Sequence, residues 1–152
     1  MLCLLLTEFF NLENLSQIVL CILGTLAFAI TMNAPVKSLI YILIGSTITA
    51  AGENIMVKRY NEFIACMTAM LALFIFCEIT AKLTKQPTTV ILLPSTIPLL
   101  PGSAIYYTML YAIQGSRELM MSYAKLTLFA GLGIALGALI GSAALTLSRR
   151  EK

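Results

Sequence analysis

The 152-residue chain contains no histidine, no aspartate and no tryptophan, and its seven acidic residues are all glutamate. These absences exclude Ser-His-Asp triads, histidine-ligated zinc or haem, H-E-x-x-H helices and aspartate dyads, because each of them needs a residue that is missing. An intramembrane hydrolase is disfavoured as well, since neither histidine nor aspartate is present to activate a serine or a water molecule. We therefore expect that the protein is not an enzyme and has no metal site and no cofactor.

Charged residues are also scarce. They make up 11% of the chain, whereas 59% is apolar and the mean hydropathy is +0.93; soluble domains are about 45–50% apolar and about 25% charged. This composition predicts an integral membrane protein in contact with the lipid bilayer. The net charge of +3 lies at the ends of apolar segments, so it indicates membrane orientation and no nucleic-acid binding. The four cysteines form no C-x-x-C pair and are interpreted as small apolar side chains.

Apolar stretches separated by short polar breaks account for most of the chain. A bilayer core needs about 20 apolar residues per helix, and each stretch is long enough to cross it. None shows the alternation of a strand, and an open sheet could not satisfy its backbone in lipid. The sequence therefore predicts an all-α membrane protein with about five transmembrane helices, at about 15–32, 36–56, 63–81, 88–113 and 126–147.

The two ends of the chain and its basic residues predict the topology. Residues 1–14 carry Glu8 and Glu13 and lack a basic start, so we expect a retained interfacial lead-in rather than a signal peptide. Residues 15–147 form the transmembrane domain, and residues 148–152 form a basic cytoplasmic tail. The basic residues favour an outside N-terminus and a cytoplasmic C-terminus in the cytoplasmic (inner) membrane. One side receives Lys37, Lys82, Lys85, Arg149, Arg150 and Lys152, and the other receives Lys58, Arg59 and Arg117, with Lys125 at the mouth of the last helix.

The fourth stretch contains three prolines, Pro94, Pro98 and Pro101, followed directly by Gly102. Each proline removes a backbone donor and crowds the carbonyl four residues earlier. The span should therefore break near the middle of the membrane, where a break is tolerated only if it is buried in protein or lines a cavity. A proline-kinked packing helix without a functional break is the alternative interpretation.

A helix that starts near Gly102 would offer an anion site. The free N–H groups of Ser103, Ala104 and Ile105, together with the positive end of the helix dipole, could hold a substrate carboxylate. Hydroxyl groups of the following residues add polar contacts. The candidate substrate-binding residues are Pro98, Pro101, Gly102, Ser103 and Tyr106, with Tyr107 and Thr108 beside them.

Glu53 and Glu78 are the candidates for proton coupling. Glu53 shares a stripe of small and polar side chains with Gly45 and Thr49 that should face the bundle, and an ionisable group inside a membrane protein marks a pathway. The alternative interpretation of Glu53 is a solvated position at the membrane–water interface. Glu78 precedes Lys82 by four residues, the favourable order for a local ion pair, so a boundary salt bridge is its alternative.

Glycines mark helix faces suited to close packing. Gly45 lies in the second stretch, and Gly133, Gly137 and Gly141 form two overlapping G-x-x-x-G units in the fifth. The helix that packs on Gly133, Gly137 and Gly141 belongs either to the same chain or to a neighbouring subunit. The second arrangement would make the protein a homo-oligomer.

Two runs of the sequence, taken together, resemble a known family. Residues 28–39 read FAITMNAPVKSL, with an N-x-P-x-K turn after the first span, and residues 97–106 read IPLLPGSAIY. With Gly45, the broken fourth span and the glycine-rich fifth, the chain resembles the threonine/serine exporter (ThrE) superfamily over nearly its whole length, specifically its small YjjB-type membrane subunit. The resemblance implies a secondary exporter of threonine and serine, or of a dicarboxylate such as succinate. It also implies a larger partner subunit with five spans of its own and a cytoplasmic region.

We interpret the chain as one half of a secondary exporter of small carboxylates, driven by the proton gradient, with alternating access around the break in the fourth span. A scaffold or assembly subunit that transports nothing is the alternative, and in that case the glycine faces would matter and the break would not. A small multidrug exporter is disfavoured because residues 18–32 contain no acidic residue.

Overall fold

The computed structural model describes the backbone of residues 12–57 and 60–150 and the side chains of residues 19–57 and 60–144. Within these ranges it contains helices and no strands, which confirms the predicted all-α class. Most of the predicted lead-in, residues 1–14, and the last two residues of the predicted tail lie outside the described residues.

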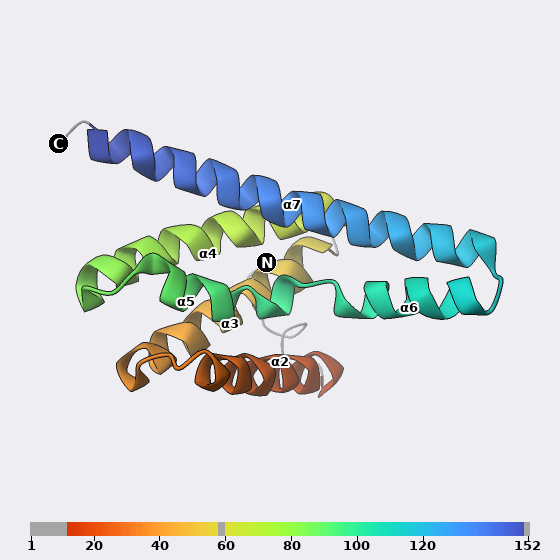
Figure 1. Ribbon diagram of the computed structural model, residues 1–152, viewed down its shortest axis with the longest axis horizontal. Helices are drawn as coiled ribbons and strands as arrows, with labels where there is room; N and C mark the ends of the chain where they lie inside the picture. Colours follow the sequence, from red (N-terminus) through yellow and green to blue (C-terminus); the bar gives the residue numbers. More distant parts are fainter. Residues whose placement is uncertain (1–11, 58–59, 151–152) are drawn as a thin grey trace.

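The helices follow the predicted stretches closely. α2 covers Leu12–Thr31, α3 covers Val36–Val57 and α4 covers Glu62–Thr84. The fourth stretch is divided, as predicted, and α7 closes the chain (Figure 1). The divided stretch consists of α5 (Thr88–Ser95), the 3-10 helix η1 (Ile97–Leu99) and α6 (Gly102–Ile113), and α7 covers Arg117–Arg150.

The polar breaks in the sequence coincide with left-handed backbone at the helix ends. Asn33 follows α2 with φ 53°, Lys85 caps α4 with φ 54°, and Gly115 joins α6 to α7 with φ 75°. A left-handed residue ends a helix by turning the chain away from its axis. Pro35 and Pro87 follow two residues after the first two of these positions, where a proline cannot continue the preceding helix.

Several of these helices can cross a membrane. By length and composition, α3, α4 and the part of α7 over Arg117–Ala144 qualify. The pair Thr88–Leu99 and Gly102–Ile113 qualifies together as one span bent by 49°. Val19–Thr31 is a shorter apolar helix within the part of α2 whose side chains are described. The described residues therefore provide three spans, or four with the bent pair, and the broken fourth stretch is confirmed.

The last helix begins earlier than the apolar stretch that predicted it. α7 starts at Arg117 rather than near residue 126 and has 34 residues, about 51 Å at 1.5 Å per residue. The extra turns carry Arg117, Glu118 and Lys125, which a search for uncharged runs excludes. They remain helical because this part of α7 packs antiparallel along α6 (Figure 1).

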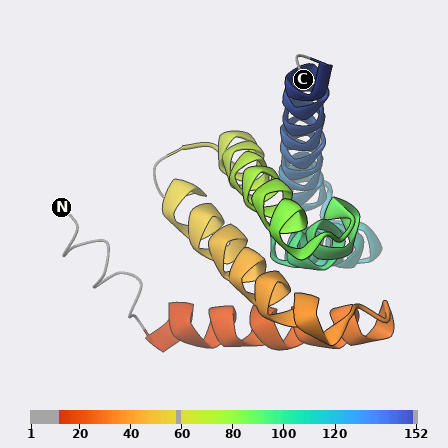
Figure 2. The same ribbon diagram turned by 90° about the vertical axis from the view of Figure 1, so that its left-hand side faces the viewer.

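The glycine face of α7 packs against α4 of the same chain. A Cβ built at Gly133 would lie 2.5 Å from the Phe63 carbonyl oxygen, and one at Gly137 would lie 2.8 Å from the Met67 carbonyl oxygen. At Gly141 it would lie 2.7 Å from the ring of Phe74. Figure 2 shows α7 beside α4, with α2 on the far side of α3. Of the two placements considered for this glycine face, the structure has the one within the subunit.

Candidate functional site

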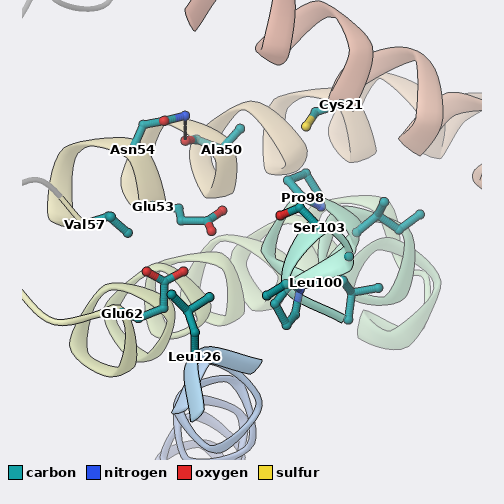
Figure 3. Close-up of a pocket in the computed structure, with 14 residues that line it drawn as sticks. Cys21, Ala50, Glu53, Asn54, Val57, Glu62, Pro98, Leu100, Ser103 and Leu126 are labelled. Carbon is teal, nitrogen blue, oxygen red and sulfur yellow. Dashed lines mark hydrogen bonds between the residues drawn. The ribbon is translucent and has the colours of Figure 1, made fainter. Parts of the chain in front are cut away.

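A cavity of about 460 Å³ lies where the fourth span breaks. Residues from α2, α3, α4, α7 and the η1–α6 break all line it, so the main helices of the fold converge there. Figure 3 shows the acidic side chains of α3 and α4 on one side and the start of α6 on the other. The lining includes Cys21, Ala50, Glu53, Asn54, Val57, Glu62, Pro98, Pro101, Gly102, Ser103 and Leu126.

The break is built by prolines and fixed by a contact between α5 and α3. Pro94 lies within α5, Pro98 lies within η1, and Pro101 is the residue before α6. Just before the break, the Ser95 hydroxyl donates to the Ile42 carbonyl oxygen at 3.2 Å. The prolines explain why the helix stops, and this contact helps to place the end of α5 against α3.

Gly45 makes that close approach of α5 possible. A Cβ at Gly45 would lie 2.7 Å from Ser95 Oγ, so a larger residue would push α5 away from α3. One turn further along α3, the Thr49 hydroxyl donates to the Ser95 carbonyl oxygen at 3.1 Å. The predicted stripe of Gly45, Thr49 and Glu53 therefore runs from the α5 contact to the cavity.

The first turn of α6 forms one wall of the cavity. The N–H of Ile105 donates to the Pro101 carbonyl oxygen at 3.0 Å. The prediction that the Ile105 N–H is free is therefore wrong, because the helix already forms its first i to i−4 bond at this residue. The N–H groups of Ser103 and Ala104 have no acceptor among the described residues. These two groups, with the exposed Ser103 side chain, can receive an anion.

Tyr106 does not line the cavity. Its side chain is 61% exposed, and its ring meets that of Tyr107 edge-on at 5.5 Å between centroids. Tyr107 and Tyr111 pack with Tyr123 of α7, at centroid distances of 5.2 and 5.6 Å. Because Tyr106 precedes Tyr107 by one residue, it lies on a different side of α6. The sequence prediction placed Tyr106 in the substrate site by its distance along the chain, and the rotation of the helix separates it from that site.

The opposite wall of the cavity is acidic. Carboxylate oxygens of Glu53 on α3 and Glu62 on α4 and the sulfur of the buried Cys66 all lie within 4.8 Å of one another. In the described part of the chain, neither carboxylate accepts a hydrogen bond or pairs with a cation. Two carboxylates this close repel each other when both are ionised, and a proton or a cation between them removes the repulsion. Two carboxylates and a thiol are also possible ligands for a divalent metal ion, which the sequence analysis did not expect.

Glu78 lies in a different part of the fold. It is 4% exposed, and one of its carboxylate oxygens is 3.5 Å from the ammonium of Lys82. The hydroxyl of Thr88, at the start of α5, donates to the other oxygen at 3.3 Å. The ion pair that the i,i+4 spacing indicated is therefore present, and Glu78 does not line the cavity.

Glu62 is the site residue that the sequence analysis missed. The available signal was the short connection of six residues, 57–62, between the second and third apolar stretches. Such a connection makes two helices antiparallel neighbours, so a residue one turn before the end of α3 must lie near the first turn of α4. Glu53 and Glu62 have these two positions.

Comparison with known families gives one match. Residues 17–144 match the family model described as threonine/serine exporter, ThrE. The matched range includes all the residues that line the cavity. Curated proteins and solved structures give no match.

Proposed function

Because the chain belongs to the threonine/serine exporter family, we propose that it is the small membrane subunit of a secondary exporter of small carboxylates. The substrates are threonine and serine, or a dicarboxylate such as succinate. The observation that supports this proposal is the cavity at the broken span, where the free N–H groups of Ser103 and Ala104 face a space large enough for such a molecule. Half-helix N-termini hold substrate carboxylates in other transporters.

The bend between α5 and α6 gives the proposal a mechanism. The substrate carboxylate accepts hydrogen bonds from Ser103 and Ala104, and the positive end of α6 stabilises its charge. Pro98, Pro101 and Gly102 form the same wall, so a change in the 49° bend moves the binding groups. Alternating access then consists of rocking this bundle against its partner around the break.

We further propose that the partner is a larger subunit of the same superfamily with five spans of its own. Two units with an odd number of spans, joined in sequence, have opposite orientations, and inverted pairs with a site at the midplane are a common transporter plan. The distribution of basic residues supports an outside N-terminus and a cytoplasmic C-terminus in the inner membrane.

The scaffold alternative depends on a free glycine face for binding another subunit. The glycine face of α7 is occupied by α4 of the same chain, so this face is not available to bind another subunit. Export is therefore the function that the geometry favours.

An export assay tests this proposal. We expect proteoliposomes that contain this chain and its larger partner to release labelled threonine, serine or succinate, and proteoliposomes with either chain alone to release none. Release by this chain alone would contradict the need for a partner and would indicate a homo-oligomer. If both chains are inserted and in complex but release none of the three, the exporter proposal fails and the scaffold is favoured.

Proton coupling gives a second prediction, which separates the two candidate carboxylates. Glu53 lines the cavity, whereas Glu78 is paired with Lys82 outside it. We expect Glu53→Gln to lose export driven by an imposed pH gradient, because the amide cannot carry the proton. We expect Glu78→Gln to keep the pH-driven component, whatever it does to stability. Export by Glu53→Gln that responds normally to the gradient would contradict the assignment.

A further inference from the structure

The break in the fourth span leaves one backbone carbonyl without its usual helical partner. In a continuous α-helix the N–H of Leu99 would donate to the Ser95 carbonyl oxygen, four residues earlier. Here the Leu99 N–H donates to the Thr96 carbonyl oxygen at 3.0 Å, in the 3-10 pattern of η1, and Pro98 has no N–H. No other backbone N–H among the described residues donates to the Ser95 carbonyl. Ser95 is fully buried, and the bilayer core supplies no water to satisfy it.

Thr49 of α3 provides the missing donor. Its hydroxyl group is fully buried and lies 3.1 Å from the Ser95 carbonyl oxygen. The same hydroxyl lies 2.9 Å from the Ser46 carbonyl oxygen and 3.2 Å from the Gly45 carbonyl oxygen, both on its own helix. A hydroxyl group has a single hydrogen, which rotates to suit its acceptor. The hydrogen can therefore turn from α5 to α3 without leaving the Thr49 hydroxyl unpaired.

We propose that Thr49 is a positioning residue for export, which holds the fourth span in its bent form through the Ser95 carbonyl. This inference rests on the proposed function, in which the bend is the part that moves. In the bent form the Thr49 hydroxyl donates to Ser95. In a straighter form the Leu99 N–H returns to Ser95, and the Thr49 hydroxyl turns to Ser46. The Ser95 carbonyl and the Thr49 hydroxyl keep a partner in both forms, so the contact is reversible.

The second hydrogen bond between α5 and α3 is reversible in the same way. The Ser95 hydroxyl donates to the Ile42 carbonyl oxygen of α3 at 3.2 Å. A serine in a helix can also donate to the carbonyl four residues earlier, which for Ser95 is that of Ile91. The end of α5 can therefore move away from α3 without leaving either hydroxyl group unpaired in the protein interior.

The bend controlled by this contact places one wall of the cavity. Ile97 and Pro98, two and three residues after Ser95, line the cavity together with Gly102. Removal of the Thr49 hydroxyl leaves the Ser95 carbonyl without a donor in the bent form only, so the straighter form becomes more populated. In membrane proteins one interhelical hydrogen bond changes such a ratio by about three- to twentyfold. We expect Thr49→Val to raise the ratio of straighter to bent forms by a factor in this range.

Thr47 on the same helix supplies the matched control. Its hydroxyl donates to the Leu43 carbonyl oxygen at 2.8 Å and has no acceptor on another helix among the described residues. Thr47→Val therefore makes the same chemical change on α3 without affecting the contact with α5. Thr49→Ser is the second control, because it keeps the hydroxyl group at position 49 and removes only a methyl group.

Spin labels on α3 and α6 measure the bend itself. Ile44 on α3 and Met109 on α6 are exposed and are replaced with cysteine, in a chain whose four native cysteines have been changed to alanine. Pulsed electron paramagnetic resonance then gives the distribution of distances between the labels, for the complex with the larger partner in lipid. We expect Thr49→Val to shift the populations by about three- to twentyfold, and Thr47→Val and Thr49→Ser to leave them within about twofold of the wild type.

Initial export rates of the unlabelled variants give the second readout. After the amounts of inserted protein have been equalised, export by Thr49→Val should be at least threefold slower than export by Thr47→Val. Thr49→Ser should restore the rate to within about twofold of the wild type. Because valine and threonine have nearly the same shape, this rescue assigns the effect to the hydroxyl group rather than to packing. If Thr49→Val does not insert, Thr49→Ala removes the same hydroxyl group and replaces it in both measurements.

The outcomes separate this inference from the proposed function. Distance distributions and export rates that are the same in Thr49→Val and Thr47→Val would overturn the role of Thr49 and leave the exporter intact. A loss that Thr49→Ser does not reverse would also overturn it, because the methyl group would then be responsible. If the distances shift as expected but the wild-type complex exports nothing, Thr49 does hold the bend and the proposed function fails.

Discussion

Replacing Gly102 with valine is expected to abolish export while leaving the chain inserted and folded. Gly102 is the first residue of α6 and lines the cavity. A Cβ at this position would meet no heavy atom within 4 Å, and its backbone does not have a left-handed φ. The added side chain is therefore tolerated by the fold, and it occupies space beside the N–H groups that receive the substrate. A misplacement of about 1 Å in a binding site can reduce a rate by about 10²-fold, so we expect a loss of at least that size.

The matched control for this variant is Gly24→Val. Gly24 lies in α2, is also free of heavy atoms within 4 Å of a built Cβ, and does not line the cavity. Initial export rates from proteoliposomes are compared after the amounts of inserted protein have been equalised. Export by Gly102→Val at the wild-type rate would show that the start of α6 does not bind substrate.

The broken span could be predicted because its cause is local. Prolines at 94, 98 and 101 disfavour a continuous helix whatever surrounds them. In the structure Pro94 lies within α5 one residue before its end, Pro98 lies in the 3-10 helix η1, and Pro101 directly precedes α6. The ends of α2 and α4 were predictable for the same reason, because Asn33 and Pro35 follow α2 and Lys85 and Pro87 follow α4 within the chain itself. Local sequence therefore indicated where the wall formed by α6 begins.

The acidic wall could not be predicted in the same way because it needs two helices. Glu53 alone was ambiguous between a solvated position and a buried one, and only the antiparallel packing of α3 and α4 brings Glu62 and Cys66 beside it. Tyr106 shows the opposite error, because a residue close in sequence was assigned to the site although the rotation of α6 turns it away. Both errors arise from packing and helix rotation, which spacing along one segment does not determine.

Replacing Gly137 with alanine is expected to destabilise the protein, because Gly137 lies at the contact between α7 and α4. A single added methyl group would lie 2.8 Å from the Met67 carbonyl oxygen and 2.8 Å from Met70 Cβ. The carbonyl belongs to the backbone of α4 and cannot rotate away, so the two helices must separate. Overpacking of this kind costs about 1–3 kcal/mol, and we expect the free energy of unfolding to fall by that amount.

Gly131→Ala separates this contact from the general effect of alanine in a helix. Gly131 lies on the same helix, and a Cβ there would meet no heavy atom within 4 Å. Both substitutions gain the same helix propensity, up to about 1 kcal/mol, so the difference between them measures the contact with α4 alone. We expect Gly131→Ala to be neutral or stabilising and Gly137→Ala to be destabilised when both are unfolded by denaturant in the same detergent. Equal stability of the two variants would mean that the glycine face of α7 does not pack against α4. It would then be available to bind a neighbouring subunit, as the scaffold alternative requires.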